Sequence, residues 1–272
     1  MHQKEERLTT YKEEISEHAP YRPIPVHLRK KVNDEIKFMV DQDIIEPVTG
    51  PVEWCSNPVI VPKPNSDDIR ITVDLRAVNK SLQDTHKPIP SVEALKTTFH
   101  SKTIFSKMDF RSAFSQIEIE EKSRKFLVFR VENQLFQYKR MTMGLLPASG
   151  EFMNAIAPQF DDIKQVTMIH DDVIISGETQ EDHDEGVRAF LQRTSDLNLT
   201  LNESKCIISK HEVSFWGLII SKNGIKPNPL KIKTLEQQTR PQNKDELISF
   251  LAMVRSNTDF YTEHCEGDCI IT

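Results

Sequence analysis

The chain has little cysteine, no long apolar run and no excess of basic residues. Its four cysteines are scattered over 272 residues, which suits a reducing compartment better than a disulfide framework. No run approaches the ~18 apolar residues that read as a membrane span, and the first residues lack the apolar core of a signal peptide. With 38% hydrophobic residues and a mean hydropathy of −0.47, we expect a soluble globular protein with a sizeable core.

Charge and metal ligands set further limits. The net charge of −6 and the pI of about 5.9 argue against tight binding of nucleic acid through overall charge. A local basic groove is compatible with that total, and modest affinity with strong salt dependence is then expected. His264, Cys265 and Cys269 supply three of the four ligands that a structural zinc site needs, so no zinc is predicted there.

The most informative segment spans residues 166–176 and reads Val-Thr-Met-Ile-His-Asp-Asp-Val-Ile-Ile-Ser. Two apolar, β-branched runs flank Asp171 and Asp172, which predicts a β-hairpin with both carboxylates at its tip. Carboxylate oxygens are hard ligands suited to Mg²⁺. The other two Asp-Asp pairs, at 67–68 and 161–162, lack strand signals on both sides and are expected at the surface.

A third carboxylate follows an upstream strand. Residues 103–109 read as a strand that ends on Asp109, and residues 112–116 suit a short helical turn. Three carboxylates in one place would satisfy a two-metal site, whose ions lie about 3.5–4 Å apart. The alternative is that Asp109 caps the turn that follows it.

The remaining pattern predicts an α+β fold, an antiparallel sheet with helices on one face. Residues 1–20 are expected to be a flexible lead or a frayed helix. Strand hairpins are expected at 57–62 with 69–75, at 126–131 with 135–138, and at 212–221 with a bend at Gly217. Helices are expected at 28–40 (apolar face Val32, Ile36, Val40), 91–99, 147–157, 179–197 (capping box Thr179 and Asp182; apolar face Val187, Phe190, Leu191, Leu197), 229–236 and 244–254.

A series of motifs, in order, resembles the reverse transcriptase of gypsy-type LTR retrotransposons and retroviruses over residues 24–261. Residues 44–47 and 53–58 resemble its opening segment, and 61–64 with 69–80 its fingers hairpin. Phe105-Ser106-Lys107-Met108-Asp109 resembles the first catalytic motif, and residues 143–152 the next. Residues 169–172 resemble the aspartate box, and residues 199–206 and 215–217 the two motifs after it.

The resemblance implies a right-hand polymerase. Residues 1–23 would be a flexible lead, 24–102 the fingers with the start of the palm, and 103–222 the palm with a second fingers hairpin (126–140) and the primer grip. Residues 223–272 would be a partial thumb or connection and a tail. The implied activity is RNA-directed DNA polymerisation, a two-metal nucleotidyl transfer from dNTPs to the 3′-hydroxyl of a DNA or RNA primer on an RNA or DNA template, without a membrane partner.

The resemblance also implies roles for individual residues. Asp109, Asp171 and Asp172 would hold two Mg²⁺ ions, with Mn²⁺ as a substitute, and Lys205 would protonate the leaving pyrophosphate. The implied primer grip is Phe215, Trp216 and Gly217. The implied substrate-binding residues are Lys63, Arg70, Phe110, Phe114, Met143 and Gly144. Asp74 and Arg76 are expected to form a structural ion pair or to brace the template strand.

Arg70 would grip the triphosphate, because a guanidinium fork fits phosphate oxygens, and Phe114 would exclude a 2′-hydroxyl. Alternatives stay open at this level. The alternatives are that Arg70 and Lys205 are surface residues and that Phe114 and Trp216 are core side chains.

Several positions depart from the family pattern. Ile169 replaces an aromatic residue, and His170 replaces an apolar residue that in the family sits near the primer end. Met143 replaces Phe or Gln, Thr142 replaces Pro, and Gly150 weakens a helix start. A catalytically impaired, decayed or co-opted remnant that binds nucleic acid is therefore the alternative function, whereas a nucleotide cyclase would have no use for a primer grip.

Motifs of other polyprotein domains are lacking. The sequence has no protease, RNase H or integrase signature, which suggests a polymerase core cut from a longer polyprotein. The expected location is the cytoplasm or a virus-like particle.

Overall fold

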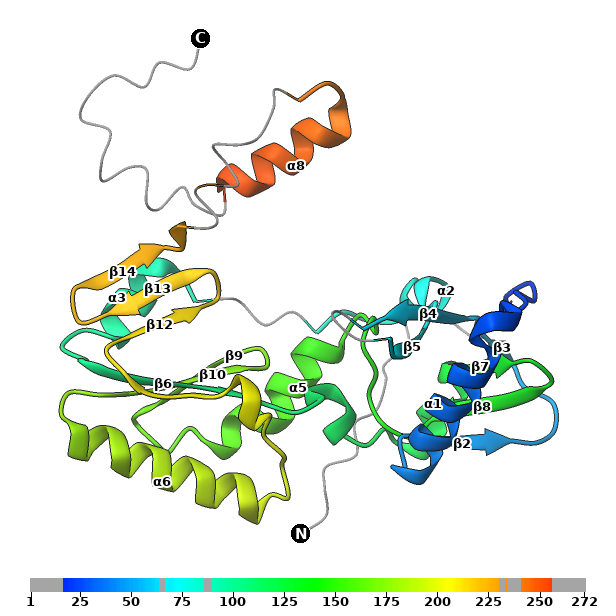
Figure 1. Cartoon of the computed structure of the whole chain (residues 1–272), viewed down its shortest axis with the longest axis horizontal. Coiled ribbons are helices and arrows are strands. Elements are labelled where there is room, and N and C mark those ends of the chain that lie inside the picture. The colour runs from blue at the N-terminus through cyan, green and yellow to red at the C-terminus, as the bar shows by residue number, and fades with distance from the viewer. Residues whose placement is uncertain (1–16, 64–66, 86–89, 230–232, 234–240, 256–272) are drawn as a thin grey trace. The chain divides into compact units, whose positions relative to one another are not determined.

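The computed structural model describes residues 17–63, 67–85, 90–229, 233 and 241–255, and the chain divides into two compact units. The first unit comprises Met1–Pro88, Phe110–Asp161 and Arg193–Thr200. The second comprises Ile89–Asp109, Asp162–Gln192 and Leu201–Thr272. Each unit is therefore built from three separated segments, and the chain passes from one unit to the other directly after Asp109. Figure 1 labels the elements used below.

The first unit holds three small sheets and several short helices. Strands β2, β8 and β7 form an antiparallel sheet in that order, β4 pairs with β5, and β1 pairs in parallel with β3. The bounds are β1 Glu17–His18, α1 Arg29–Asp41, β2 Ile45–Val48, β3 Trp54–Cys55, β4 Pro58–Pro62, β5 Ile69–Val73, α2 Arg76–Asn79, α4 Glu121–Arg124, β7 Val128–Val131, β8 Gln134–Tyr138 and α5 Ala148–Ile156, with 3-10 turns at Val26–Leu28, Ala113–Gln116, Lys125–Leu127 and Ala157–Gln159.

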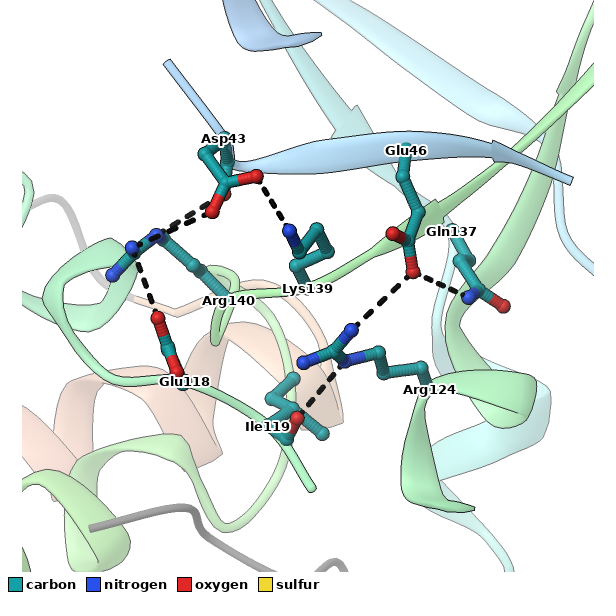
Figure 2. A network of polar contacts seen from close by, with 8 residues as sticks. All are labelled: Asp43, Glu46, Glu118, Ile119, Arg124, Gln137, Lys139 and Arg140. Carbon is teal, nitrogen blue, oxygen red and sulfur yellow. Dashed lines mark hydrogen bonds and ion pairs between the residues drawn. The ribbon is translucent and has the colours of Figure 1, made fainter. Parts of the chain in front are cut away.

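A polar network fastens strand β2 and the residues before it to β8 and to the segment at 118–124 (Figure 2). Arg140 lies 3.1 Å from Glu118 and 3.8 Å from Asp43, and Lys139 lies 2.5 Å from Asp43. Glu46 accepts from Gln137 at 2.7 Å and from Arg124 at 3.4 Å. The network ties together segments more than 70 residues apart, so it fixes the hairpin β7–β8 against β2.

The second unit is built on a four-stranded antiparallel sheet in the order β11-β6-β10-β9. A second antiparallel sheet, β12-β13-β14, contributes to the same apolar core. The bounds are α3 Val92–Thr98, β6 Ile104–Asp109, β9 Val166–Ile169, β10 Asp172–Gly177, α6 Gln180–Asp196, β11 Ile207–Lys210, β12 Glu212–Phe215, β13 Leu218–Ser221, β14 Gly224–Pro227 and α8 Lys244–Arg255, with a 3-10 turn at Glu203–Lys205.

The two faces of the large sheet have different neighbours, because side chains alternate along a strand. Phe105 and Ile174 share a buried cluster with Leu95 and Phe99 of the α3 region and with Val213, Phe215, Leu218, Ile220 and Ile225 of the smaller sheet. Lys107 and Asp109 belong to this same face, since they follow Phe105 at steps of two. The carboxylate of Asp109 thus stands at the end of a face that is apolar further along the strand.

The opposite face packs on α6, which Figure 1 shows running along the sheet. Ser106 is fully buried on this face, and its hydroxyl lies 2.8 Å from His183 Nε2 of α6. An ideal Cβ on Gly177 would lie 2.4 Å from the backbone nitrogen of His183, and one on Gly186 would lie 2.5 Å from the Cβ of Gln165. Helix and sheet approach so closely that only glycine fits at these two positions.

The fold class and the main hairpins are confirmed, with corrections in detail. On α1 the buried residues are Val32, Ile36 and Met39, so Val40 was wrongly placed on the apolar face. On α6 Leu191 is 44% exposed, and the buried face is made by His183, Gly186, Phe190 and Thr194. The helix presents two polar residues, His183 and Thr194, and a glycine to the core, which an apolar pattern does not reveal.

The N-terminal expectation also needs correction where the structure describes it. Glu17 and His18 form β1 rather than a flexible lead or a helix, because they pair with Trp54 and Cys55. Residues 64–66, most of the expected helix at 229–236, and His264, Cys265 and Cys269 lie outside the described residues. None of the described helices is long and apolar enough to cross a membrane.

Candidate active site

The acidic hairpin forms as the sequence predicts, with β9 and β10 antiparallel. His170 takes a left-handed backbone conformation (φ 55°) at the turn, and Asp171 follows it as an exposed residue. Asp172 begins β10 and pairs in register with Asp109 at the end of β6. Directly opposed residues of an antiparallel pair present their side chains on the same face, with Cβ atoms about 4.5–5.5 Å apart. The ladder therefore brings Asp109 and Asp172 together.

Two lysines accompany these carboxylates. Lys107 precedes Asp109 by two residues on the same face, and its Nζ lies 2.8 Å from Asp172 Oδ1. Lys205 Nζ lies 3.5 Å from Asp109 Oδ1, and the lysine side chain is 65% exposed. The carboxylates of Asp109 and Asp172 are only 22–24% exposed, so solvent screens the repulsion between them incompletely. The two lysine ammonium groups offset that repulsion.

The donors fit a divalent cation in type, and two of them, Asp109 and Asp172, stand at paired positions on adjacent strands. As arranged, however, the described residues hold no group of three or more His, Cys, Asp and Glu side chains placed for a metal ion. Of the three carboxylates expected together, the strand register pairs Asp109 with Asp172, whereas Asp171 is exposed in the turn before β10. Lys107 forms an ion pair with Asp172.

The loop that carries Lys205 is held at the end of β6. The backbone N–H of Asn202 donates to the carbonyl of Asp109 at 2.8 Å, and the 3-10 turn Glu203–Lys205 follows directly. This anchor explains how Lys205 comes within reach of Asp109 although 95 residues separate them.

The residues predicted as the primer grip form the tight turn between β12 and β13. Phe215 is fully buried, whereas Trp216 is 38% exposed and therefore is not a core residue. Trp216 and Gly217 both take positive φ values, 54° and 74°. The Trp216 ring stacks on the His170 ring, with centroids 5.3 Å apart and planes 13° from parallel.

The first unit holds the residues predicted to bind the nucleotide. Arg70 is exposed, and its Nη1 lies 3.6 Å from the sulfur of Met143. Asn79 donates to the carbonyl of Gly144 at 2.7 Å and accepts from the N–H of Leu146 at 2.9 Å. Asn79 thereby fastens the loop that carries Met143 and Gly144, and Gly144 has a φ of 86° that favours glycine.

Three aromatic rings in the same unit form one cluster. Phe110, which follows Asp109 in the chain, is buried and meets Phe152 edge to face at 5.7 Å. Phe114 meets the same ring at 6.0 Å and is half-buried. Phe152 therefore holds Phe114 in place while part of the Phe114 ring stays accessible.

Other charged positions are paired at the surface. Lys63 Nζ lies 3.9 Å from Glu35, and Lys31 lies 2.6 Å from Asp67. Arg76 donates two hydrogen bonds to Asp74, at 2.8 and 2.6 Å, which forms the ion pair expected from the sequence. The side-chain hydrogen bond from Arg76 holds the pKa of Asp74 below its usual value.

Sequence reasoning missed three residues of structural importance, two in the second unit and one in the first. Lys107 could have been found from its spacing of two before Asp109 on a strand. Asn79 gave no signal beyond its place in the fingers motif. His183 joins Ser106 to Asp184, since its Nδ1 lies 2.9 Å from Asp184 Oδ1. This Ser-His-Asp chain is no hydrolase triad, because Ser106 and His183 are completely buried.

The chain covers only part of its relatives in sequence. It is 27% identical over 232 residues to the uncharacterized Caenorhabditis elegans protein K02A2.6, covering 85% of this chain and 18% of that protein. It is 29% identical over 234 residues to the transposon Tf2-3 polyprotein of Schizosaccharomyces pombe, covering 85% of this chain and 17% of the polyprotein. The chain thus spans less than a fifth of these relatives.

Solved structures share the fold. The foamy viral protease-reverse transcriptase bound to double-stranded DNA superimposes with a TM-score of 0.76 at 19% identity, over 92% of this chain and 45% of that one. The same viral protein bound to an RNA/DNA hybrid gives 0.75 at 19% identity, over 96% and 36%.

The family follows from a direct match in sequence. Residues 61–220, more than half of the 272 residues, match the reverse transcriptase (RNA-dependent DNA polymerase) family. The match includes β6, the hairpin β9–β10 and the turn at Trp216. The chain therefore belongs to the reverse transcriptase family, whose members are nucleotidyltransferases.

Proposed function

We propose that the chain is the polymerase portion of a gypsy-type retrotransposon reverse transcriptase, and that it extends a primer 3′-hydroxyl with dNTPs on an RNA or DNA template. The observation that carries the proposal is the paired register of Asp109 and Asp172, with Asp171 at the adjoining tip, inside the segment that matches the family. The transposon polyprotein among the relatives supports the source. The two viral structures, bound to duplex DNA and to an RNA/DNA hybrid, support nucleic-acid partners.

Asp109, Asp171 and Asp172 are the residues that would hold two divalent cations, Mg²⁺ or Mn²⁺. When bound, such ions lower the pKa of a hydroxyl and offset charge on a transferring phosphoryl group. In the structure, Lys107 forms an ion pair with Asp172, and Lys205 forms one with Asp109. Because Lys205 is mostly exposed, its ammonium is accessible as a proton donor to a leaving pyrophosphate.

The first unit supplies recognition of the nucleotide in this proposal. Arg70 presents its guanidinium, which suits phosphate oxygens, beside the Met143 side chain. Phe114, braced by Phe152, would exclude the 2′-hydroxyl of a ribonucleotide. Asn79 keeps the loop at Met143 and Gly144 in its conformation. Residues 126–140 would belong to the fingers, and their place in the first unit supports that assignment.

A second candidate function is a non-polymerising reverse transcriptase fold that binds nucleic acid. The ion pair between Lys107 and Asp172 favours it, since it occupies a predicted metal ligand. His170 at the hairpin tip and Met143 against Arg70 also depart from the family pattern.

Primer extension on poly(rA)·oligo(dT) separates the two functions. The polymerase proposal predicts extension with dTTP in the presence of Mg²⁺ or Mn²⁺ and none after chelation with EDTA. Folded protein that binds the duplex and adds no nucleotide with either metal would contradict the polymerase and favour the second function.

A further inference from the structure

A closed ring of hydrogen bonds joins strand β6, helix α6 and strand β11 within the second unit. Its members are Ser106, His183, Asp184, Gln180 and Ser209. Ser106 Oγ lies 2.8 Å from His183 Nε2, and His183 Nδ1 lies 2.9 Å from Asp184 Oδ1. Gln180 Nε2 donates to Asp184 at 2.8 Å and to Ser209 Oγ at 3.1 Å. The backbone N–H of Ser209 donates to Ser106 Oγ at 2.9 Å, which closes the ring.

The partners in the ring assign its protons. Because Ser106 Oγ accepts from the N–H of Ser209, its single hydroxyl proton is available to His183 Nε2. The proton of a neutral imidazole then lies on Nδ1, which donates to Asp184. Ser106 and His183 are both completely buried, so water does not replace a partner lost at either residue. Removal of the Ser106 hydroxyl therefore breaks two bonds of the ring at once.

The ring closes at an irregularity in the pairing of β11 with β6. Two residue pairs flank this irregularity, Ile207 with Lys107 and Lys210 with Phe105. Between these pairs β11 has two residues, Ile208 and Ser209, where β6 has only Ser106. Two residues opposite one make a β-bulge, at which the ladder is locally interrupted. Ser209 takes a left-handed φ of 50° at this point, and the bond from its N–H to Ser106 holds the bulge.

The bulge sets the position of Lys205, which lies shortly before it in the chain. Lys205 stands between two attachments to β6, because Asn202 donates to the carbonyl of Asp109 and Ser209 donates to the hydroxyl of Ser106. A slip of one residue in strand pairing turns every side chain of a strand to the opposite face. The extra residue of the bulge therefore decides where the turn before β11 lies, and with it the 3.5 Å approach of Lys205 to Asp109.

We propose that this ring positions Lys205 for the reaction, and that Ser106 and His183 are positioning residues that act through the lysine. They do so by holding the bulge from the buried contact of β6 with α6. In the proposed function Lys205 protonates the leaving pyrophosphate, so a displaced turn slows the chemical step and leaves nucleotide binding unchanged. The inference rests on the proposed polymerase function and adds to it two residues that lie outside the predicted site.

Two substitutions open the ring, and a third serves as the matched control. Ser106→Ala removes the buried hydroxyl, whereas Gln180→Ala opens the ring at an exposed residue and keeps the proposal testable if Ser106→Ala does not fold. Ser176→Ala is the control, because Ser176 is also a buried serine of the same sheet but lies outside the ring. Thermal melting of each variant, compared with the parent protein, controls for folding.

Hydrogen exchange followed by mass spectrometry measures the hold on the turn without any polymerase activity. The amides of residues 203–210 should exchange at least about fivefold faster in Ser106→Ala than in the parent protein, because a buried polar group loses its partner. Gln180→Ala should change these rates in the same direction, and Ser176→Ala should leave them at the parent value. Exchange at residues 218–227, in β13 and β14, should stay at the parent rate in all variants.

A double-mutant cycle with Lys205→Met separates positioning from general stability. The maximal rate of single-turnover extension should fall at least about fivefold in Ser106→Ala, a part of the roughly 10²–10⁴-fold that a positioned proton donor contributes, with the apparent affinity for dNTP unchanged. In the Lys205→Met background the same substitution should have no further effect, because residues that act through one group are not additive. A fall by an equal factor in both backgrounds would reveal a structural role alone and overturn the proposal.

The remaining outcomes distinguish the positioning proposal from the polymerase proposal. Exchange at residues 203–210 that stays at the parent rate in both Ser106→Ala and Gln180→Ala would overturn the positioning proposal. If this exchange responds but even the parent protein adds no nucleotide, the polymerase proposal fails, whereas the hold of the ring on the turn is confirmed. If Ser106→Ala does not fold, Gln180→Ala decides both measurements in the same way.

Discussion

At the scale of residues, the candidate site consists of charges already compensated within the chain. Asp172 pairs with Lys107 and Asp109 pairs with Lys205, so the carboxylates are neutralised by lysines in the arrangement described. A divalent cation that binds here must compete with at least the Lys107 ammonium. Under the proposed function, the two lysines would therefore lower the affinity of the site for a divalent cation.

Replacing Lys107 by Met should tighten binding of Mn²⁺. The substitution removes a cation 2.8 Å from Asp172 while keeping a side chain of similar length. We expect an affinity gain of about tenfold, which corresponds to 1.4 kcal/mol, measured by calorimetry on protein without nucleic acid. Lys102→Met is the matched control, because Lys102 pairs with Glu178 and Asp182 rather than with the candidate ligands. Unchanged or weaker Mn²⁺ binding by Lys107→Met would refute the competition.

Replacing Phe114 by Val should admit ribonucleotides. The ring is held by Phe152 and is half-buried, so its loss opens space without removing a fully buried side chain. The ratio of kcat/KM for rNTP over dNTP should rise by at least about tenfold, in line with the 1–3 kcal/mol typical of steric discrimination in a pocket. Phe126→Leu, at a buried ring of the same unit that has no implied role in substrate binding, serves as the control. A variant that discriminates as well as the parent would show that Phe114 is a core residue.

At the scale of elements, close packing requires residues at positions where their helix propensity is unfavourable. Gly150 lies within α5, where glycine costs up to about 1 kcal/mol relative to alanine. The structure supplies the reason for it, since an ideal Cβ at this position would lie 1.8 Å from the carbonyl oxygen of Thr85. A departure from the family pattern is thus a packing requirement of this chain.

Gly150→Ala should therefore destabilise the protein despite its better helix propensity. Overpacking costs about 1–3 kcal/mol, which exceeds the propensity gain. The urea midpoint should fall relative to the parent protein, whereas Asn154→Ala in the same helix should leave it equal or higher. A raised midpoint for Gly150→Ala would show that Thr85 moves away at little cost.

The start of α6 should respond to acid. Asp182 accepts from Gln165 Nε2 at 2.9 Å and from the N–H of Glu178 at 3.0 Å, and Lys102 lies 3.6 Å away. The hydrogen bond from Gln165, then that from Glu178, holds the pKa of Asp182 below its usual value. A lowered folded-state pKa contributes stability above the unfolded value near 3.9, and this contribution is lost as pH falls through the folded value.

Asp182→Asn should accordingly cost about 1 kcal/mol at pH 7, since the group is one-third exposed. The cost should shrink when urea unfolding is repeated below pH 3. Thr179 stays as the helix cap through its bond to the N–H of Asp182, so the helix itself should persist by circular dichroism. An equal cost at both pH values would mean that the ionised carboxylate contributes nothing.

At the scale of the whole molecule, local sequence patterns predicted the helices and strands but not the contacts between residues far apart in the sequence. Alternating apolar residues revealed β4–β5, β7–β8, β9–β10 and β12–β13, because each hairpin closes within a short segment. The parallel pairing of Glu17 with Trp54 spans 37 residues and left no periodic signal. The buried His183 was missed because a histidine on a helix reads as exposed until its partner Ser106 is known.

For the candidate site, too, local patterns were predictable from the sequence and long-range contacts were not. The motifs located Asp109, Asp171 and Asp172, and the structure pairs the end of β6 at Asp109 with the start of β10 at Asp172. The pairing of Lys107 with Asp172 follows from the register of two neighbouring strands, whereas the stack of His170 on Trp216 joins the turns of two different sheets. No spacing in the sequence specifies the contact between His170 and Trp216.

The most direct test of the central claim is primer extension by Asp171→Asn beside Asp161→Asn. Asp171 is exposed at the hairpin tip, so its charge is not needed for packing. Because the substitution removes a proposed metal ligand, the rate of extension should fall by at least about a thousandfold, the scale of strong active-site losses. Folding and duplex binding should be nearly unchanged. Asp161, from another Asp-Asp pair and also exposed, is the control and should retain the parent rate. Extension by Asp171→Asn at the rate of the parent protein would contradict the account.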